Sequence, residues 1–269
     1  RLAALRAGDV EGYRAMVSAA KDTRLREILE ETERILGDLR APAAADSDVD
    51  TPRMLGGLDG AAVLMPHQKQ GLRWLASMVD NQMSGILADD MGLGKTVQTL
   101  ALFAYLKEQR GDPGPHLVLV PLSTLPNWRD EVERWLPGFG CMGFRGTKAA
   151  VQRMKAQLHQ QGLTGAGAIN VVLSSYETAK SHAGFLGHIP WSTVVVDEGQ
   201  RLKNSKSQVS QAVRTFPCRH RLLLSGTPIQ NSLRELWSLL SFVAPRSFCS
   251  LDDFEQWFAL PPPPTIRLG

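Results

Sequence analysis

The sequence predicts an α/β fold in which a parallel β-sheet is flanked by helices on both faces. From Val63 onward, short β-rich runs alternate with amphipathic helical patterns, which is the order of elements in doubly wound domains. Residues 194–196 and 222–224 are apolar at every position, as expected of parallel strands that are buried on both faces. Ligands of such domains bind at the carboxyl ends of the strands, so functional residues are expected there.

The same patterns give the element boundaries. Strands are predicted at residues 84–88, 116–120, 169–174, 192–196 and 221–224, where apolar and β-branched residues cluster. Helices are predicted between them, at residues 68–79, 96–109 and 127–135.

Four segments divide the chain. Residues 1–40 are predicted to form an amphipathic helical segment, because apolar residues recur at helical spacing from Leu25 to Leu39, and such a stripe needs a partner surface. Pro42 ends this pattern, and residues 41–60 are expected to form a flexible linker. Residues 61–260 hold the α/β domain, and the Pro-rich residues 261–269 are expected to form a stiff tail.

Charge and cysteine content restrict the class of protein. The net charge is +3 and the pI is near 8.8, which permits a polyanionic partner without requiring one. The stretch from Gly199 to Arg234 has no acidic residue. It is interpreted either as a solvated basic face or as a phosphate-binding surface, and its basic residues are Arg201, Lys203, Lys206, Arg214, Arg219, Arg221 and Arg234.

The cysteines argue against a zinc site or a disulfide framework. Cys141, Cys218 and Cys249 lie far apart without a paired spacing, so they are interpreted as reduced thiols of an intracellular protein. No apolar run approaches the length of a membrane span, and no membrane partner is expected.

The strongest motif, at residues 89–96, follows the first predicted strand and precedes a helical pattern. In this position glycines let backbone N–H groups close around phosphate oxygens, a lysine reaches the terminal phosphates and a hydroxyl binds Mg²⁺. Asp89 departs from the usual phosphate-binding loop, because it stands where the first glycine is common. The predicted nucleotide-binding residues of this loop are Asp89, Met91, Gly92, Leu93, Gly94, Lys95 and Thr96.

Two adjacent carboxylates end the apolar run at residues 194–196. Asp197 is expected to bind Mg²⁺ together with Thr96, and Glu198 to polarise the attacking water. With Lys95 they form the predicted catalytic set. Helix capping is the alternative role for carboxylates at a strand end. The catalytic interpretation requires Lys95 and Thr96 to meet Asp197 and Glu198 across one triphosphate-sized gap.

These acidic residues carry a family resemblance. The run Asp197-Glu198-Gly199-Gln200 resembles the Asp-Glu-Gly-His box of the Swi/Snf (Brahma-type) chromatin-remodelling ATPases of helicase superfamily two. Further segments resemble motifs of that family in order and spacing: PHQKQGLRWL at 66–75, LVLVPLSTLPNW at 117–128, LSSYE at 173–177, SGTPIQN at 225–231 and ELWSLL at 235–240. The match runs from about Val63 to Phe258 and implies a RecA-like fold.

The resemblance implies roles for single residues. Gln68 would read the adenine edge of ATP. A coupling set would link hydrolysis to movement, and it comprises Gln200, Ser225, Thr227 and Gln230. A DNA-binding set would track the backbone without reading bases, and it comprises Pro121, Ser123, Trp128, Ser175, Tyr176, Lys203 and Asn204. Trp128 also lies in a helical apolar pattern that favours a packing role, as do Trp135, Trp237 and Trp257.

Partners follow from the same resemblance. ATP and Mg²⁺ would be the ligands, double-stranded DNA or the nucleosome the track, and the nucleus the location. Residues 9–40 resemble the helix that precedes the motor and contacts regulatory or actin-related subunits. The family site also needs arginines from a second RecA-like lobe, whose motifs do not occur before Gly269. These residues alone are therefore expected to bind ATP weakly and to hydrolyse it negligibly.

One departure concerns coupling. Gln200 stands where the family has His. Glutamine donates and accepts hydrogen bonds but does not carry a proton at neutral pH, so hydrolysis is expected to survive and coupling to DNA to be altered.

Two other functions stay open at this point. One is a truncated, non-catalytic nucleotide-binding or protein-interaction module. The other is a related helicase-like ATPase of DNA repair or transcription termination, although the helix at residues 9–40 favours the Swi/Snf branch.

Overall fold

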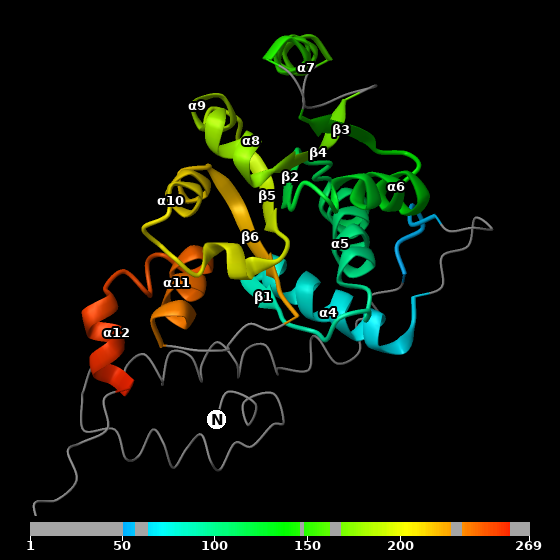
Figure 1. The fold of residues 1–269 in the computed structure, drawn as a ribbon. Coiled ribbons are helices and arrows are strands. Elements are labelled where there is room, and N and C mark those ends of the chain that lie inside the picture. The colour runs from blue at the N-terminus through cyan, green and yellow to red at the C-terminus, as the bar shows by residue number, and fades with distance from the viewer. Residues whose placement is uncertain (1–50, 57–63, 146–147, 162–167, 227–232, 259–269) are drawn as a thin grey trace, which may run out of the picture. The chain divides into compact units, whose positions relative to one another are not determined.

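A six-stranded sheet forms the centre of the computed structural model, which describes residues 51–56, 64–145, 148–161, 168–226 and 233–258 (Figure 1). The strands are paired in parallel throughout, in the order β1-β6-β5-β2-β4-β3. They are β1 (Gly85–Leu87), β2 (His116–Val120), β3 (Gly140–Phe144), β4 (Ile169–Ser175), β5 (Trp191–Val196) and β6 (Cys218–Leu224). The predicted α/β class with a parallel sheet is confirmed.

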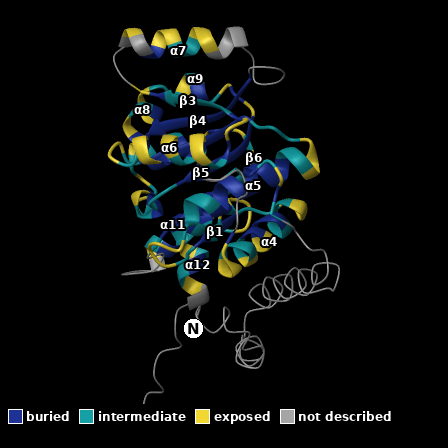
Figure 2. Cartoon of the chain, turned by 90° about the vertical axis from the view of Figure 1, so that its right-hand side faces the viewer, coloured by how far each residue is buried: buried dark blue, intermediate teal, exposed yellow. Residues whose placement is uncertain are grey.

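Helices cover both faces of this sheet (Figures 1 and 2). The helices are α4 (Pro66–Asp80), α5 (Lys95–Arg110), α6 (Leu125–Trp135), α7 (Lys148–Gln161), α8 (Tyr176–Ser181), α9 (Ala183–Leu186), α10 (Gln208–Arg214), α11 (Leu233–Val243) and α12 (Leu251–Phe258), with a 3₁₀ turn η2 (Gly199–Leu202). Not one of the described helices is long and apolar enough to cross a membrane.

Alternating side chains of the central strands divide the core in two. Val118 and Val120 of β2 pack with residues of α4, α5 and α6 on one face. Leu117 and Leu119 of the same strand pack with residues of α8, α9, α10 and α11 on the other. Because these strands are buried on both faces, they appear in the sequence as continuous apolar runs.

The five predicted strands and three predicted helices are present, with ends shifted by a few residues. The sequence did not predict β3, nor the helices α7 to α10 and α12. Strand β3 contains two glycines and no β-branched residue, so it lacks the usual strand composition. Gly140 is needed there because a Cβ atom would lie 2.2 Å from the carbonyl oxygen of Ala168 on the neighbouring chain segment.

The chain forms two compact units. One, Val49–Gln256, holds the sheet; the other combines Arg1–Asp48 with Trp257–Gly269. The predicted helical segment 1–40 and the tail 261–269 lie outside the described residues, as does the linker 41–60 apart from residues 51–56. The boundaries of these segments stay predictions.

Close packing fixes the turn that follows β5. Gly199 begins η2 and lies against the fully buried Leu223 of β6, whose Cδ2 atom would be 2.1 Å from a Cβ atom at position 199. By contrast, a Cβ atom at Gly184 of α9 would meet nothing within 4 Å.

We therefore expect Gly199→Ala to destabilise the protein by about 1–3 kcal/mol, because the added methyl group overpacks a close-packed core. Gly184→Ala is the control, and it should leave stability unchanged or raise it by up to ~1 kcal/mol through helix propensity. Urea unfolding of both variants measures the difference. Equal free energies of unfolding for the two would contradict this account of the turn.

Candidate active site

The glycine-containing loop after β1 has the shape of a phosphate-binding loop. Gly92 and Gly94 have φ angles of 84° and 78°, in the left-handed region that favours glycine. Helix α5 begins at the next residue, Lys95. The Lys95 ammonium donates to the carbonyl oxygens of Asp89 at 2.9 Å and Asp90 at 3.0 Å. The loop thus holds its cation beside a helix N-terminus, where an anion is favoured.

Two other side chains brace this loop. Gln98 of α5 is fully buried, and its amide donates to Asp89 Oδ2 at 3.0 Å and to the Leu93 carbonyl at 3.3 Å. The aspartate that replaces the usual glycine is therefore part of the loop's internal bonding. His67 of α4 contacts the Leu93 carbonyl from the other side, at 3.2 Å.

Gln68 lies at the edge of the same loop. Its Oε1 atom accepts from the Met65 N–H at 3.0 Å. Its Nε2 atom lies 2.4 Å from where a Cβ atom of Gly94 would be, so the amide covers the last glycine. The structure therefore places Gln68 beside the loop, on the first turn of α4.

Asp197 and Glu198 follow the last residue of β5. The Asp197 N–H donates to the Leu119 carbonyl at 2.9 Å, which extends the pairing of β5 with β2 by one residue. Each carboxylate oxygen of Asp197 accepts one hydrogen bond: Oδ1 from the Glu198 N–H at 2.9 Å and Oδ2 from the Trp128 indole at 2.8 Å. Glu198 has a φ of 54°, which turns the chain sharply after the strand.

Charge and burial oppose one another at Asp197. Burial raises the pKa of this carboxyl above its ordinary value and the Glu198 charge adds to the rise, while the Trp128 and Glu198 hydrogen bonds and the Lys95 ammonium oppose it without reversing it. Strands β1, β6 and β5 are paired in parallel, so the loop after β1 and the carboxylates after β5 follow carboxyl ends at the same edge of the sheet. The two predicted halves of the site, the loop after β1 and the carboxylates after β5, therefore share that edge.

The first residues of the coupling segment lie between these halves. Ser225 follows β6, and its N–H donates to the Leu87 carbonyl of β1 at 3.1 Å. A Cβ atom on Gly226 would lie 3.0 Å from the Met91 side chain. Thr227 and Gln230 lie outside the described residues.

Gln200 contacts the second carboxylate. Its Nε2 atom donates to Glu198 Oε2. Its Oε1 atom is buried and has no hydrogen-bond partner in the part of the chain that the structure describes. Gln200 therefore restrains Glu198, while its Oε1 atom accepts no hydrogen bond from the described residues.

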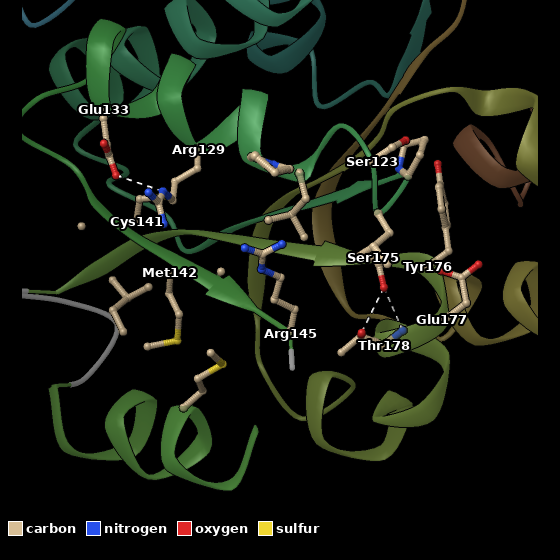
Figure 3. A pocket seen from close by; sticks show the side chains of 18 of the residues that line it. Ser123, Arg129, Glu133, Cys141, Met142, Arg145, Ser175, Tyr176, Glu177 and Thr178 are labelled. Carbon is tan, nitrogen blue, oxygen red and sulfur yellow. Dashed lines mark hydrogen bonds and ion pairs between the residues drawn. The ribbon is translucent and has the colours of Figure 1, made fainter. Parts of the chain in front are cut away.

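A cleft of about 1530 Å³ extends from the ends of β2 and β4 along β3, and residues of α6 and α7 also line it (Figure 3). Figure 3 shows Ser123, Arg145 and Ser175 around this cleft, with the Ser175 hydroxyl turned toward Thr178. Four residues predicted to track DNA are in its lining, namely Pro121, Ser123, Ser175 and Tyr176. The sequence did not single out the cationic side chains Arg129 and Arg145 or the hydroxyl of Thr178, which also line it, and it noted Arg201 only as part of the basic stretch.

The remaining DNA-track candidates lie elsewhere or have other partners. Trp128 is 3% exposed and is bonded to Asp197. Lys203 forms an ion pair with Glu235 at 3.0 Å. The side-chain oxygen of Asn204 accepts from the Lys206 N–H at 3.0 Å. Ser175 caps α8 by accepting from the Thr178 N–H.

Three of the seven basic residues of the acid-free stretch pair with carboxylates outside it, and Lys203 is one of them. Arg219 pairs with Asp112, and Arg234 pairs with Glu255. The half-buried Arg214 and Arg221 donate to carbonyl oxygens of α11, those of Ser238 and Phe242. Arg201 is the member of the stretch that lines the cleft. A basic run in sequence is therefore not a continuous basic face in space.

Comparison with known proteins gives a consistent picture. Residues 67–263 match the model of the SNF2-related domain family. The chain is 42% identical to the human SWI/SNF-related matrix-associated actin-dependent regulator of chromatin subfamily A member 1, covering 91% of this chain and 23% of that protein. It is 35% identical to the nuclear protein STH1/NPS1 of Saccharomyces cerevisiae, covering 97% of this chain and 21% of that protein.

Solved structures agree with these matches. The Sulfolobus solfataricus SWI2/SNF2 ATPase core in complex with dsDNA is 30% identical, with a TM-score of 0.64, and the match covers 76% of this chain and 40% of that one. The structure of the Sulfolobus solfataricus SWI2/SNF2 ATPase core domain gives a TM-score of 0.63 at 29% identity, covering 79% of this chain and 40% of that one. The chain thus spans less than a third of the two curated relatives and two fifths of the solved ones.

Proposed function

The chain belongs to the SNF2-related family, and we propose that it is the first nucleotide-binding lobe of a DNA-dependent ATPase that translocates along double-stranded DNA and remodels chromatin. One observation carries this proposal. The Lys95 loop, the Asp197 carboxylate and the start of the coupling segment follow the parallel strands β1, β5 and β6 and so share one edge of the sheet, and the cleft reaches that edge where β2 and β4 end. The family core bound to dsDNA supports the choice of track.

In the proposed site each residue has a separate task. The backbone of the loop from Asp89 to Gly94 would enclose the phosphates of ATP, and Lys95 would leave the loop carbonyls to bind the terminal ones. Gln68, beside Gly94, would contact the base. Glu198, restrained by Gln200, would orient and deprotonate the attacking water.

The donor set also fits a magnesium ion. Asp197 keeps lone pairs on both carboxylate oxygens beyond the one hydrogen bond that each accepts. Thr96 is the second residue of α5 and would supply a hydroxyl. Oxygen donors with several water ligands are the usual environment of Mg²⁺. When bound, the ion would neutralise charge on the phosphates.

The cleft would hold the DNA backbone. Ser123 is exposed and lies in the loop between β2 and α6. Arg145 and Arg201 add positive charge to the lining, which also holds Glu177 and the ion pair of Arg129 with Glu133. Hydroxyl and cationic groups bind phosphates without reading bases, which suits movement along any sequence. Lys203 and Asn204, predicted to join this surface, would need to leave their present partners.

The proposed motor needs a second lobe. Arginines from that lobe would stabilise charge on the transferring phosphoryl group, a contribution of about 10³ to 10⁵ in rate. We therefore propose that the 269 residues, expressed with nothing added, hydrolyse ATP negligibly. Residues 9–40 are proposed to bind regulatory or actin-related subunits. The chain is assigned to the nucleus, in line with relatives named as a nuclear protein and as chromatin regulators.

The nucleotide roles predict different defects in two variants of a protein that includes both lobes. Lys95→Ala should lower both ATP affinity and turnover by at least ~100-fold, since a charge-assisted phosphate contact is lost. Glu198→Gln should keep ATP affinity and lower turnover by about 10² to 10⁴-fold, since only the base is lost. Lys107→Ala, at the far end of α5, is the control. ATPase assays and equilibrium nucleotide binding distinguish the defects of the two variants. Normal turnover of the Glu198→Gln protein would refute the role of Glu198 as the base.

The cleft predicts a salt effect. Arg201→Gln should weaken binding to duplexes of any sequence and reduce the slope of log K against log salt by about 1, the value for one lost phosphate contact. The matched control is Arg219→Gln, which removes the same charge near the start of β6, at the opposite edge of the sheet. Fluorescence anisotropy over a salt series measures both. Equal slopes for the two variants would exclude Arg201 from the track.

The glutamine in the acidic box predicts altered coupling. Gln200→His, in the protein with both lobes, should leave DNA-free hydrolysis within about twofold and raise the stimulation by DNA at least about fivefold, a modest coupling free energy. The reason is that the family histidine, unlike glutamine, carries a proton near neutral pH. Gln208→His, on the exposed start of α10, is the control. Equal stimulation of parent and variant would count against the prediction.

A further inference from the structure

Two buried aromatic side chains converge on Asp197 from the segments that form the cleft. The Trp128 indole donates to the carboxylate at 2.8 Å. The Tyr176 hydroxyl donates to the main-chain carbonyl oxygen of the same residue. Trp128 and Tyr176 are 3% and 2% exposed, so water does not compete readily for either bond.

Trp128 belongs to the segment that follows β2. Its backbone N–H donates to the Thr124 carbonyl at 3.0 Å, and Thr124 bonds in turn to the Pro121 carbonyl through both its N–H and its hydroxyl. Pro121 and Ser123 line the cleft. A short chain of hydrogen bonds therefore connects this loop to the backbone of Trp128.

Tyr176 belongs to the segment that follows β4. It is the first residue of α8, directly after the capping residue Ser175, and both line the cleft. Ser175 ties the start of α8 to Thr178 by two side-chain bonds. The tyrosine therefore lies on the helix end that would meet a DNA phosphate.

The two bonds restrain different parts of the catalytic turn. The indole fixes the orientation of the carboxylate, which the Glu198 N–H holds on its other oxygen. The tyrosine fixes the peptide that joins Asp197 to Glu198, at the point where Glu198 adopts a φ of 54°. Loss of the first bond frees a metal-binding group to rotate, and loss of the second frees the base.

We propose that Trp128 and Tyr176 are positioning residues that transmit occupancy of the DNA cleft to Asp197 and Glu198. The proposal rests on the proposed function, because it assumes that the cleft binds DNA and that Asp197 serves ATP hydrolysis. Under this proposal Trp128 is buried beneath the DNA cleft and binds Asp197, and it does not contact DNA itself. Groups that orient a metal-binding side chain commonly change metal affinity or activity by about 10- to 100-fold when removed.

The chain supplies matched controls for both residues. Trp135 lies on the same helix as Trp128, and its indole also donates to a carboxylate, that of Glu131 at 2.7 Å. Tyr105 is also buried, and its hydroxyl donates to the Asp80 carboxylate at 2.9 Å, where that of Tyr176 donates to a main-chain carbonyl oxygen. Replacing each with phenylalanine keeps a ring and removes one donor.

The experiment compares Trp128→Phe and Tyr176→Phe with Trp135→Phe and Tyr105→Phe in the protein that includes both lobes. Turnover is measured with and without duplex DNA and over a Mg²⁺ titration, and DNA affinity is measured by anisotropy. We expect the first pair to lose about tenfold or more of DNA-stimulated turnover, with DNA affinity within about twofold of the parent. Trp128→Phe should also need about tenfold more Mg²⁺ for half-maximal turnover. The control pair should match the parent.

The outcomes separate the inference from the function on which it rests. The proposed function fails, and the inference with it, if the parent protein shows no DNA-stimulated turnover or if Lys95→Ala does not abolish that turnover. If the parent is stimulated and the first pair responds to DNA and Mg²⁺ as the controls do, the inference alone is overturned. Thermal unfolding of all four variants identifies any that do not fold. If Trp128→Phe or Tyr176→Phe does not fold, the other of these two variants decides whether the inference holds.

Discussion

The position of β5 between β2 and β6 is the constraint on which the site depends. Parallel pairing on both sides brings the carboxyl ends of β1, β6, β5, β2 and β4 to one edge of the sheet. Asp197 continues the pairing by one residue, through its bond to the Leu119 carbonyl. As a result the residue has the phosphate-binding loop and the coupling segment on one side and the cleft on the other. The two pairings of β5 thus set where the nucleotide site and the cleft lie relative to Asp197.

The central strands could be predicted because burial on both faces leaves a continuous apolar run, as at residues 194–196. The rest of the sheet lacks that signal. Strand β3 lies at an edge and contains two glycines. The first half of β6 is polar and only partly buried, so its predicted start was three residues late. Helices α8, α9 and α10 have four to seven residues, too few for an amphipathic period to emerge from the sequence.

The site was predictable where chemistry restricts residue type, as at Lys95 or Asp197, and not where it depends on distant contacts. Trp128 and Asp197 are separated by 69 residues in sequence, and a helical apolar pattern gives the tryptophan's burial without its hydrogen-bond acceptor. Likewise the acid-free basic stretch meets its carboxylates in Asp112, Glu235 and Glu255, each outside the stretch. Charge partners of this kind are set by the fold, and the order of residues does not reveal them.

The two outer strands bear on how the protein coexists with other chains. Strand β1 has three residues, and β3 carries two glycines and a shift of register next to Gly140. Short or irregular outer strands are poor templates for sheet extension by a foreign strand, which is a common route to aggregation. Both borders of the sheet therefore discourage self-association.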